Sequence, residues 1–173
     1  MRLFFICSLA LLTLNLPAQK LPCAKAGSQT LSLMTGEWNI TATDRTSPGN
    51  YEENKGKSTI TWGISGCSLH EVYQGIFKSH DYAVEYVTYL SDSLSTQRTF
   101  FDSEHSNIMV FTGEISEKSI LNYWYRDPEK KRMQVKNEIR FINKNSFENI
   151  SHLSTDYGKT WQLTHKWVYY KHR

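Results

Sequence analysis

The sequence has few of the patterns that mark common catalytic or metal-binding sites. Its 173 residues contain three cysteines and four prolines. The six histidines are scattered, with no H-x-H or H-E-x-x-H spacing, so we expect no metal site. There is no G-x-S-x-G nucleophile elbow and no Gly-rich phosphate loop. The familiar hydrolase and nucleotide-binding classes are therefore disfavoured, and we expect no cofactor.

The chain also lacks a strong charge of one sign. Its formal net charge is +3, and the single basic cluster, Lys130-Lys131-Arg132, follows Asp127-Pro128-Glu129. A short run of this kind next to acidic residues is typical of a solvated turn. We therefore expect no nucleic-acid partner.

Long apolar runs are missing except at the N-terminus, which reads MRLFFICSLALLTLNLPAQ. A basic residue, an apolar stretch too short to span a bilayer and a small-residue cleavage site indicate a secretory signal peptide over residues 1–19. We expect a soluble, secreted or periplasmic protein without a transmembrane segment. It would comprise a leader over residues 20–35, with a short helical turn, and one domain over residues 36–173.

Cysteine usage fits an oxidising compartment. Cys7 leaves with the signal peptide, and Cys23 and Cys67 remain. One disulfide between them is compatible with such a compartment. Whether they pair depends on the distance between their Cβ atoms, which the sequence leaves open.

From Gly36 onward the chain shows alternation with a period of two. Residues 38–42, 82–90, 133–141 and 161–169 alternate in this way and are rich in aromatic and β-branched side chains. Such runs predict half-buried strands. About ten strands are expected, the second beginning near Lys57 after a polar connection, TSPGNYEENKG. A meander of this size favours an all-β, antiparallel up-and-down barrel.

The stretch STDYGKTW, Ser154 to Trp161, fits the Asp-box pattern of sialidase-type propellers. It occurs once, and the chain is too short for the four or more blades that a propeller needs. We interpret it as a hairpin turn. Asp156 is expected to accept bonds from backbone amides, Gly158 to permit the turn, and Trp161 to begin the final strand with its ring in the barrel.

Four stretches together carry a family resemblance: LMTGEW, ISGCSLHEVYQG, STDYGKTW and WVYYK. The chain resembles, over roughly Leu33 to Lys171, uncharacterised secreted bacterial proteins with lipocalin-like barrels of the calycin superfamily. The resemblance implies a G-x-W element at Gly36 and Trp38, with a basic residue, Lys171 or Arg173, over the tryptophan. Tyr157 stands where the group often has Gly, and Lys171 where it often ends in Arg.

Glu71 and His165 are the side chains best suited to bind a ligand or to act as acid–base groups. Glu71 shares a strand face with Tyr73 and points away from His70. It is either a ligand anchor or a structural carboxylate bonded to a tyrosine or to an arginine, Arg98, Arg126 or Arg140. His165 shares a face with aromatic residues, as a histidine that binds haem could. The G-x-W-x-G-x-G opening of haem-binding barrels is absent, however, so haem binding is disfavoured. Our candidate ligand-binding residues are Glu71, Tyr73, Trp124, Trp161, His165 and Trp167, with Met34 and Trp62 as further lumen candidates.

The aromatic content, 13% of residues, favours a barrel that binds a small, largely apolar or aromatic ligand. Two alternatives stay open. One is a barrel isomerase or hydrolase that uses Glu71 and His165 as acid–base groups. The other is a non-catalytic interaction or glycan-binding module with an exposed aromatic surface.

Overall fold

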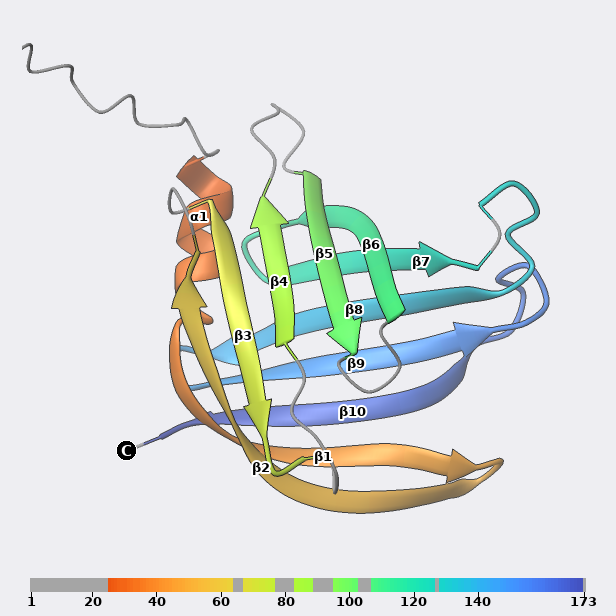
Figure 1. The fold of residues 1–173 in the computed structure, drawn as a ribbon, viewed down its shortest axis with the longest axis horizontal. Helices are drawn as coiled ribbons and strands as arrows, with labels where there is room; N and C mark the ends of the chain where they lie inside the picture. The colour runs from red at the N-terminus through yellow and green to blue at the C-terminus, as the bar shows by residue number, and fades with distance from the viewer. Residues whose placement is uncertain are drawn as a thin grey trace, which may run out of the picture.

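The described residues form a closed, ten-strand antiparallel barrel preceded by a short helix (Figure 1). The computed structural model describes residues 25–63, 67–76, 83–88, 95–102, 107–126 and 128–172. Each strand pairs with the next along the chain, and β1 also pairs with β10, which closes the sheet. The all-β up-and-down barrel predicted from the alternation is confirmed. The elements are α1 (Lys25–Ser32), β1 (Gly36–Ser47), β2 (Asn50–Trp62), β3 (Ser68–Gln74), β4 (Ala83–Thr88), β5 (Ser95–Asp102), β6 (Asn107–Ile115), β7 (Ser119–Tyr125), β8 (Gln134–Asn143), β9 (Ser146–Ser154) and β10 (Gln162–Lys171).

The first hairpin differs from the prediction. β2 begins at Asn50 rather than near Lys57, so TSPGNYEENKG is mostly strand and not a connecting loop. The turn needs two residues, Pro48 and Gly49, and Gly49 takes a positive φ of 80°. The end of this hairpin is solvated on both faces. Its strands therefore carry no apolar alternation that would reveal them in the sequence.

The barrel is packed solid at the end that carries α1. Trp38 is 1% exposed, and its indole N–H donates to the Met34 carbonyl over 2.7 Å. The ring of Phe147 meets Trp38 edge-on at 4.8 Å and stacks on Tyr169 at 4.1 Å between ring centroids. Met34, expected in the lumen, is fully buried in this cluster. Aromatic and helical packing thus fills this end of the barrel, and any open lumen lies further along it.

Lys171 of β10 holds the start of β1 in place. Its ammonium lies 4.4 Å from the ring centroid of Trp38 and donates to the Thr35 carbonyl over 2.6 Å. Gly36 has a φ of +125°, and a Cβ there would lie 2.6 Å from the Lys171 nitrogen. Only glycine satisfies both the backbone angle and this close approach. Of the two basic residues considered from the resemblance, Lys171 occupies the place over the tryptophan, and Arg173 lies outside the described residues.

The turn of STDYGKTW joins β9 to β10 and is organised by Asp156. The Thr160 N–H donates to Asp156 Oδ1 over 2.9 Å, and the Thr160 hydroxyl donates to Oδ2 over 2.7 Å. These bonds, with one from the Ser154 hydroxyl, lower the pKa of Asp156 to about 2. Asp156 therefore caps the turn as expected. Tyr157 and Gly158 both take positive φ, 65° and 80°.

Trp161 departs from its expected place. It immediately precedes β10, which begins at Gln162, so the final strand does not start at the tryptophan. Its ring lies 4.9 Å from the Lys136 ammonium. Lys136 points outward from β8, because its neighbours Val135 and Asn137 line the lumen. The Trp161 ring is accordingly on the outside of the barrel, since the turn residues 155–161 carry the chain past the strand end.

Candidate functional site

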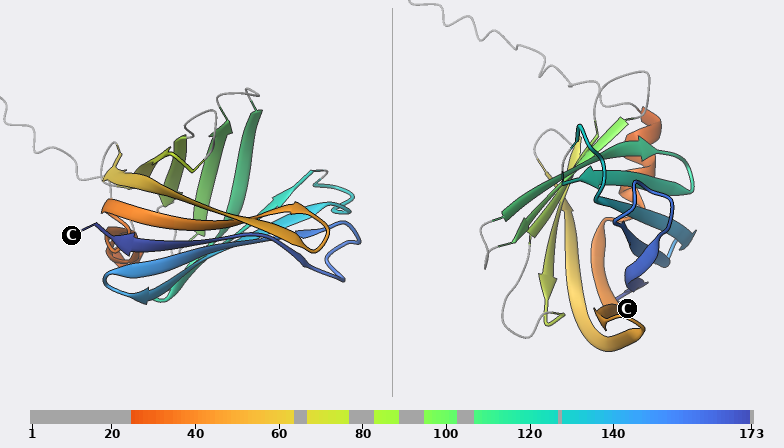
Figure 2. Two further views of the ribbon diagram at one scale, coloured as in Figure 1. Left: turned by 90° about the horizontal axis from the view of Figure 1, so that it is seen from below. Right: turned by 90° about the vertical axis from the view of Figure 1, so that its right-hand side faces the viewer.

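The barrel encloses a cavity of about 310 Å³. It occupies the region where the sheet opens, because β6 pairs with β7 only over Thr112–Ile115 and Ile120–Tyr123. Figure 2 shows β4 to β6 rising steeply away from the long strands β8 to β10. The cavity is lined by Asp44, Arg98, Phe100, Met109, Phe111, Val135, Asn137, Ser151, Thr164, His165 and Trp167. A larger depression of about 720 Å³ lies on the surface beside Arg126 and Arg132, but it is more open to solvent. The internal cavity is therefore the candidate site.

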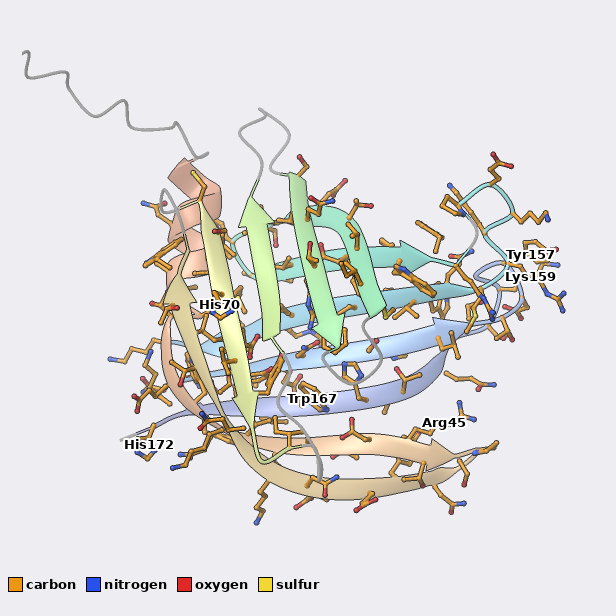
Figure 3. The ribbon with its side chains drawn as sticks, in the orientation of Figure 1. Arg45, His70, Tyr157, Lys159, Trp167 and His172 are labelled. Carbon is orange, nitrogen blue, oxygen red and sulfur yellow. The ribbon has the colours of Figure 1, made fainter. Side chains whose placement is uncertain are left out.

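One part of the cavity wall is apolar. Phe100, Met109 and Phe111 come from the neighbouring strands β5 and β6, and Val135 from β8. Trp167 of β10, labelled in Figure 3, also lines the cavity. These side chains offer large flat and flexible surfaces that favour an apolar or aromatic guest.

Trp167 is fixed from two sides. Its indole N–H donates to Asp44 Oδ1 over 2.8 Å, and its ring meets Tyr73 edge-on at 5.1 Å. Burial raises the pKa of Asp44, while the bond from Trp167 lowers it and the nearby charge of Glu52 raises it further. A tryptophan held in this way presents a preformed face to the cavity.

Polar side chains brace the barrel from wall to wall. The guanidinium of Arg98, on β5, donates to the side-chain oxygen Oδ1 of Asn137 on β8. Asn137 in turn donates to Asn149 Oδ1 on β9 over 2.6 Å. Because β5 and β8 are not neighbours in the sheet, the first of these bonds crosses the lumen. Arg98, Asn137 and Asn149 are each at most 5% exposed, so these polar groups are desolvated and held in one geometry.

Glu71 is fully buried and belongs to a second brace. Its Oε1 accepts from the Ser58 hydroxyl over 2.6 Å, and the Tyr169 hydroxyl bonds that of Tyr73 over 3.2 Å. Burial raises the pKa of Glu71, opposed in decreasing order by Ser58, by the charge of Arg98 and by the hydroxyls of Tyr73 and Tyr169. The hydroxyls of Tyr73 and Tyr169 therefore favour the charged form of Glu71 against the effect of burial.

Of the three arginines weighed as partners for Glu71, Arg98 is the one whose charge acts on it. Arg140 instead pairs with Glu138, at 3.1 Å, and Arg126 lies exposed beside Met133. His70, next to Glu71 in the chain, points out of the barrel, as Figure 3 shows and as the strand alternation predicted.

His165 enters the cavity wall through an irregularity in β10. The pairing with β9 shifts between Leu163 and His165, so Thr164 is an extra residue and both Thr164 and His165 line the cavity. Such a bulge changes the direction of side chains next to it. Burial, reinforced by the positive charge of Arg98, lowers the pKa of His165 to about 3. The imidazole is therefore neutral near pH 7, and its part-exposed surface faces the cavity.

The candidate ligand-binding residues are divided by the structure. His165 and Trp167 line the cavity, whereas Glu71 and Tyr73 are buried outside its lining. Trp124 lies half-buried opposite Val135 in the β7–β8 ladder and is also outside the lining. The prediction that Trp161 and Trp62 lie in the lumen was wrong. Trp161 lies outside the barrel, and Trp62 is 40% exposed at the end of β2. Both stand at strand ends, where alternation no longer decides which way a side chain points.

Most of the residues that line the cavity are not evident from the sequence. Met109 and Phe111 alternate with the exposed Ile108 and Val110, so β6 is apolar on both faces. The sequence therefore does not show which face of β6 points into the barrel. Asn137 and Ser151 look like surface residues in the sequence. A signal was available on β5, where Arg98 and Phe100 share a face.

Other predictions concern the ends of the chain and metal sites. The signal peptide over residues 1–19 and Cys23 lie outside the described residues, while Cys67 is disulfide-bonded. Across the part of the chain that the structure describes, no group of three His, Cys, Asp or Glu side chains could hold a metal ion. In that same part, no helix has the length and apolar character needed to cross a membrane.

Comparison with known proteins places the chain in a family. Residues 24–171 match the model described as "Protein of unknown function (DUF1579)", and the chain belongs to this family. No curated protein matches its sequence. Two solved structures share its fold. The S-type phycobiliprotein lyase CPES from Guillardia theta aligns with a TM-score of 0.57 at 10% identity, over 87% of this chain and 94% of that one. Rv2717c from M. tuberculosis aligns with a TM-score of 0.55 at 12% identity, over 85% and 98%. At these identities the likeness concerns the fold alone.

Proposed function

We propose that this member of the DUF1579 family is a calycin-like barrel that binds a small, largely apolar or aromatic molecule in its lumen. The observation that carries the proposal is the internal cavity of about 310 Å³ with its aromatic wall. This volume lies at the lower end of the range of small-molecule sites, roughly 300–1,000 Å³. The wall is preformed, because Trp167 is held by Asp44 and Tyr73.

The two alternatives are less well supported. The isomerase or hydrolase needs Glu71 to reach a substrate together with His165, and Glu71 does not line the cavity. An interaction or glycan-binding module needs aromatic side chains gathered on one surface. Among the residues whose side chains the structure describes, the exposed aromatic ones are instead distributed over β2, the β9–β10 turn and β10: Tyr51, Trp62, Tyr157 and Tyr170.

We also propose that the protein acts outside the cytoplasm, as the first 19 residues predict. Expression of the full chain in a bacterial host, followed by fractionation and mass measurement, tests this. The expected product is a periplasmic or secreted chain that begins at Lys20. A cytoplasmic product that keeps Met1 would contradict the proposal.

Ligand binding is tested with N-phenyl-1-naphthylamine, a neutral probe whose fluorescence rises in apolar surroundings. We expect stoichiometric binding and displacement by a lipid extract from the source organism. Ser151→Phe, which fills the cavity from its wall, should abolish binding. Thr59→Phe, on the solvent-exposed face of β2, should leave it unchanged and serves as the matched control. Binding that survives Ser151→Phe in a folded protein would contradict the lumen as the site.

Native mass spectrometry of protein purified from its own source provides the complementary measurement. A co-purifying small molecule that Ser151→Phe excludes would identify the ligand directly. Protein that carries no such molecule and binds no apolar probe would refute the carrier function.

A further inference from the structure

We infer that the natural ligand is an amphipathic acid, with a carboxylate that is bound by Arg98 and an apolar or aromatic body that lies on the Phe100–Trp167 side of the cavity. This inference rests on the proposed ligand-binding function and specifies the chemical class of the ligand. It depends on the charge and donor pattern of the cavity wall, which the volume alone does not reveal.

Arg98 is the basic side chain among the described residues that line the cavity. It is 5% exposed, with its guanidinium carbon 5.7 Å from the centroid of the Phe111 ring. The bond to Asn137 across the lumen sets the direction of the guanidinium, so it does not have to be ordered when a ligand enters. A guanidinium fixed in this way matches the planar geometry of a carboxylate.

Two acidic groups lie near the cavity, and each accepts a hydrogen bond from a residue other than Arg98. Asp44 is half-buried and uses Oδ1 to accept from Trp167 on the apolar wall. Glu71 lies outside the lining and takes its hydrogen bond from Ser58. The charge of Arg98 acts on Glu71 from a distance, whereas a ligand in the cavity meets Arg98 in the wall and does not meet Glu71.

His165, on β10, adds a second donor to the same cavity. Its Nε2 is buried without a hydrogen-bond partner among the described residues. Since a buried N–H without an acceptor is rarer than an unsatisfied lone pair, the neutral ring favours its proton on Nδ1. The Nδ1–H and the Arg98 N–H groups are both donors, which suits an oxygen-rich acceptor group such as a carboxylate.

The rest of the wall suits the body of such an acid. Phe111 contacts the Arg98 guanidinium and, with Phe100 and Met109, continues the wall away from it as an apolar surface from β5 and β6. Trp167 bounds the cavity from β10, with His165 at 5.0 Å between ring centroids. A cation and an apolar surface that adjoin in one cavity select a molecule with both kinds of group.

The test compares two probes of the same shape, naphthalene-2-carboxylate and its neutral isostere naphthalene-2-carboxamide, by isothermal titration calorimetry at pH 7. The wild-type protein should bind the acid about tenfold to hundredfold more tightly than the amide, as expected for a charge-assisted hydrogen bond. Arg98→Met should abolish the preference, and Arg98→Lys should retain part of it. Arg140→Met, which removes an exposed arginine outside the barrel, should leave the preference unchanged.

The outcomes separate this inference from the proposed function. If both naphthalene probes bind the wild type equally, the acid preference is refuted while the apolar site stands. If the preference survives Arg98→Met, Arg98 is not the anchor and the inference is also refuted. Should Arg98→Met fail to fold by circular dichroism, the wild-type comparison and the Arg98→Lys variant decide. If neither these probes nor N-phenyl-1-naphthylamine bind, the proposed function itself fails.

Discussion

The contact between Gly36 and Lys171 offers a quantitative test of how the barrel is closed. Replacing Gly36 with alanine places a Cβ 2.6 Å from the Lys171 nitrogen and 3.1 Å from its Cε. It also forces an L-residue into φ +125°, which costs about 1–3 kcal/mol. The lysine must then leave Trp38 and the Thr35 carbonyl. Gly36→Ala should therefore lose both the backbone energy and the lysine contacts.

Lys171→Met isolates the second part. A cation–π contact contributes about 0.5–2 kcal/mol, and a charged hydrogen bond about 1.5–3 kcal/mol. Since Lys171 is half-buried and partly screened by solvent, we expect a total loss of about 1–3 kcal/mol. Met keeps the stem but lacks the terminal nitrogen, so the alanine Cβ fits better beside it. The double variant should be less destabilised than the sum of the single variants, by about 1–2 kcal/mol.

Urea unfolding followed by tryptophan fluorescence measures these free energies, provided that each transition is two-state. Lys166→Met is the matched control on the same strand, because Lys166 pairs with Glu148 at 2.6 Å, away from Gly36. It should combine additively with Gly36→Ala. If Gly36→Ala and Lys171→Met also add within about 0.5 kcal/mol, the two residues do not share the contact and the reasoning is wrong.

Two further predictions concern the buried brace and the β9–β10 turn. Because the pKa of Glu71 is raised above 4.5 in the folded state, its stabilising contribution is present below pH 4.5 and is lost as pH rises through the folded pKa. Glu71→Gln should remove this loss, so that the stability of the variant relative to wild type increases as pH rises above 4.5 in urea titrations. Stabilities of the two proteins that change in parallel with pH would contradict this. Tyr157→Gly should raise stability by about 0.5–1 kcal/mol, because φ +65° strains tyrosine and not glycine. Tyr157→Ala keeps the strain and should bring no gain in thermal unfolding, and an equal gain would show that the strain is not the cause.

The fold was largely predictable from the sequence, and the two errors of the prediction have separate causes. Strands of half-buried alternation, such as Gln134–Asn143, were predicted close to their observed positions. The length of the β1–β2 hairpin was underestimated because its outer half is exposed to solvent on both faces. Trp161 was assigned to the final strand because aromatic character alone does not distinguish a turn residue beside a strand from the strand itself.

The candidate site was predictable only where one strand face was clear. His165 and Trp167 share a face of a well-patterned strand and both reach the cavity. Phe111 was not found, since β6 is apolar on both sides. Nor does the sequence reveal that Arg98 meets Asn137, because that bond joins strands on opposite sides of the lumen.

The sequence by itself determined the all-β class, the strand period and the Asp156 turn, because each depends on interactions between residues near one another in the chain. The tertiary structure decided which faces enclose space and which fill it. Barrel closure brings Arg98, His165 and Trp167 around one cavity while it buries Glu71 and Tyr73 beside it. That division depends on the register and tilt of strands far apart in sequence, which local patterns do not encode.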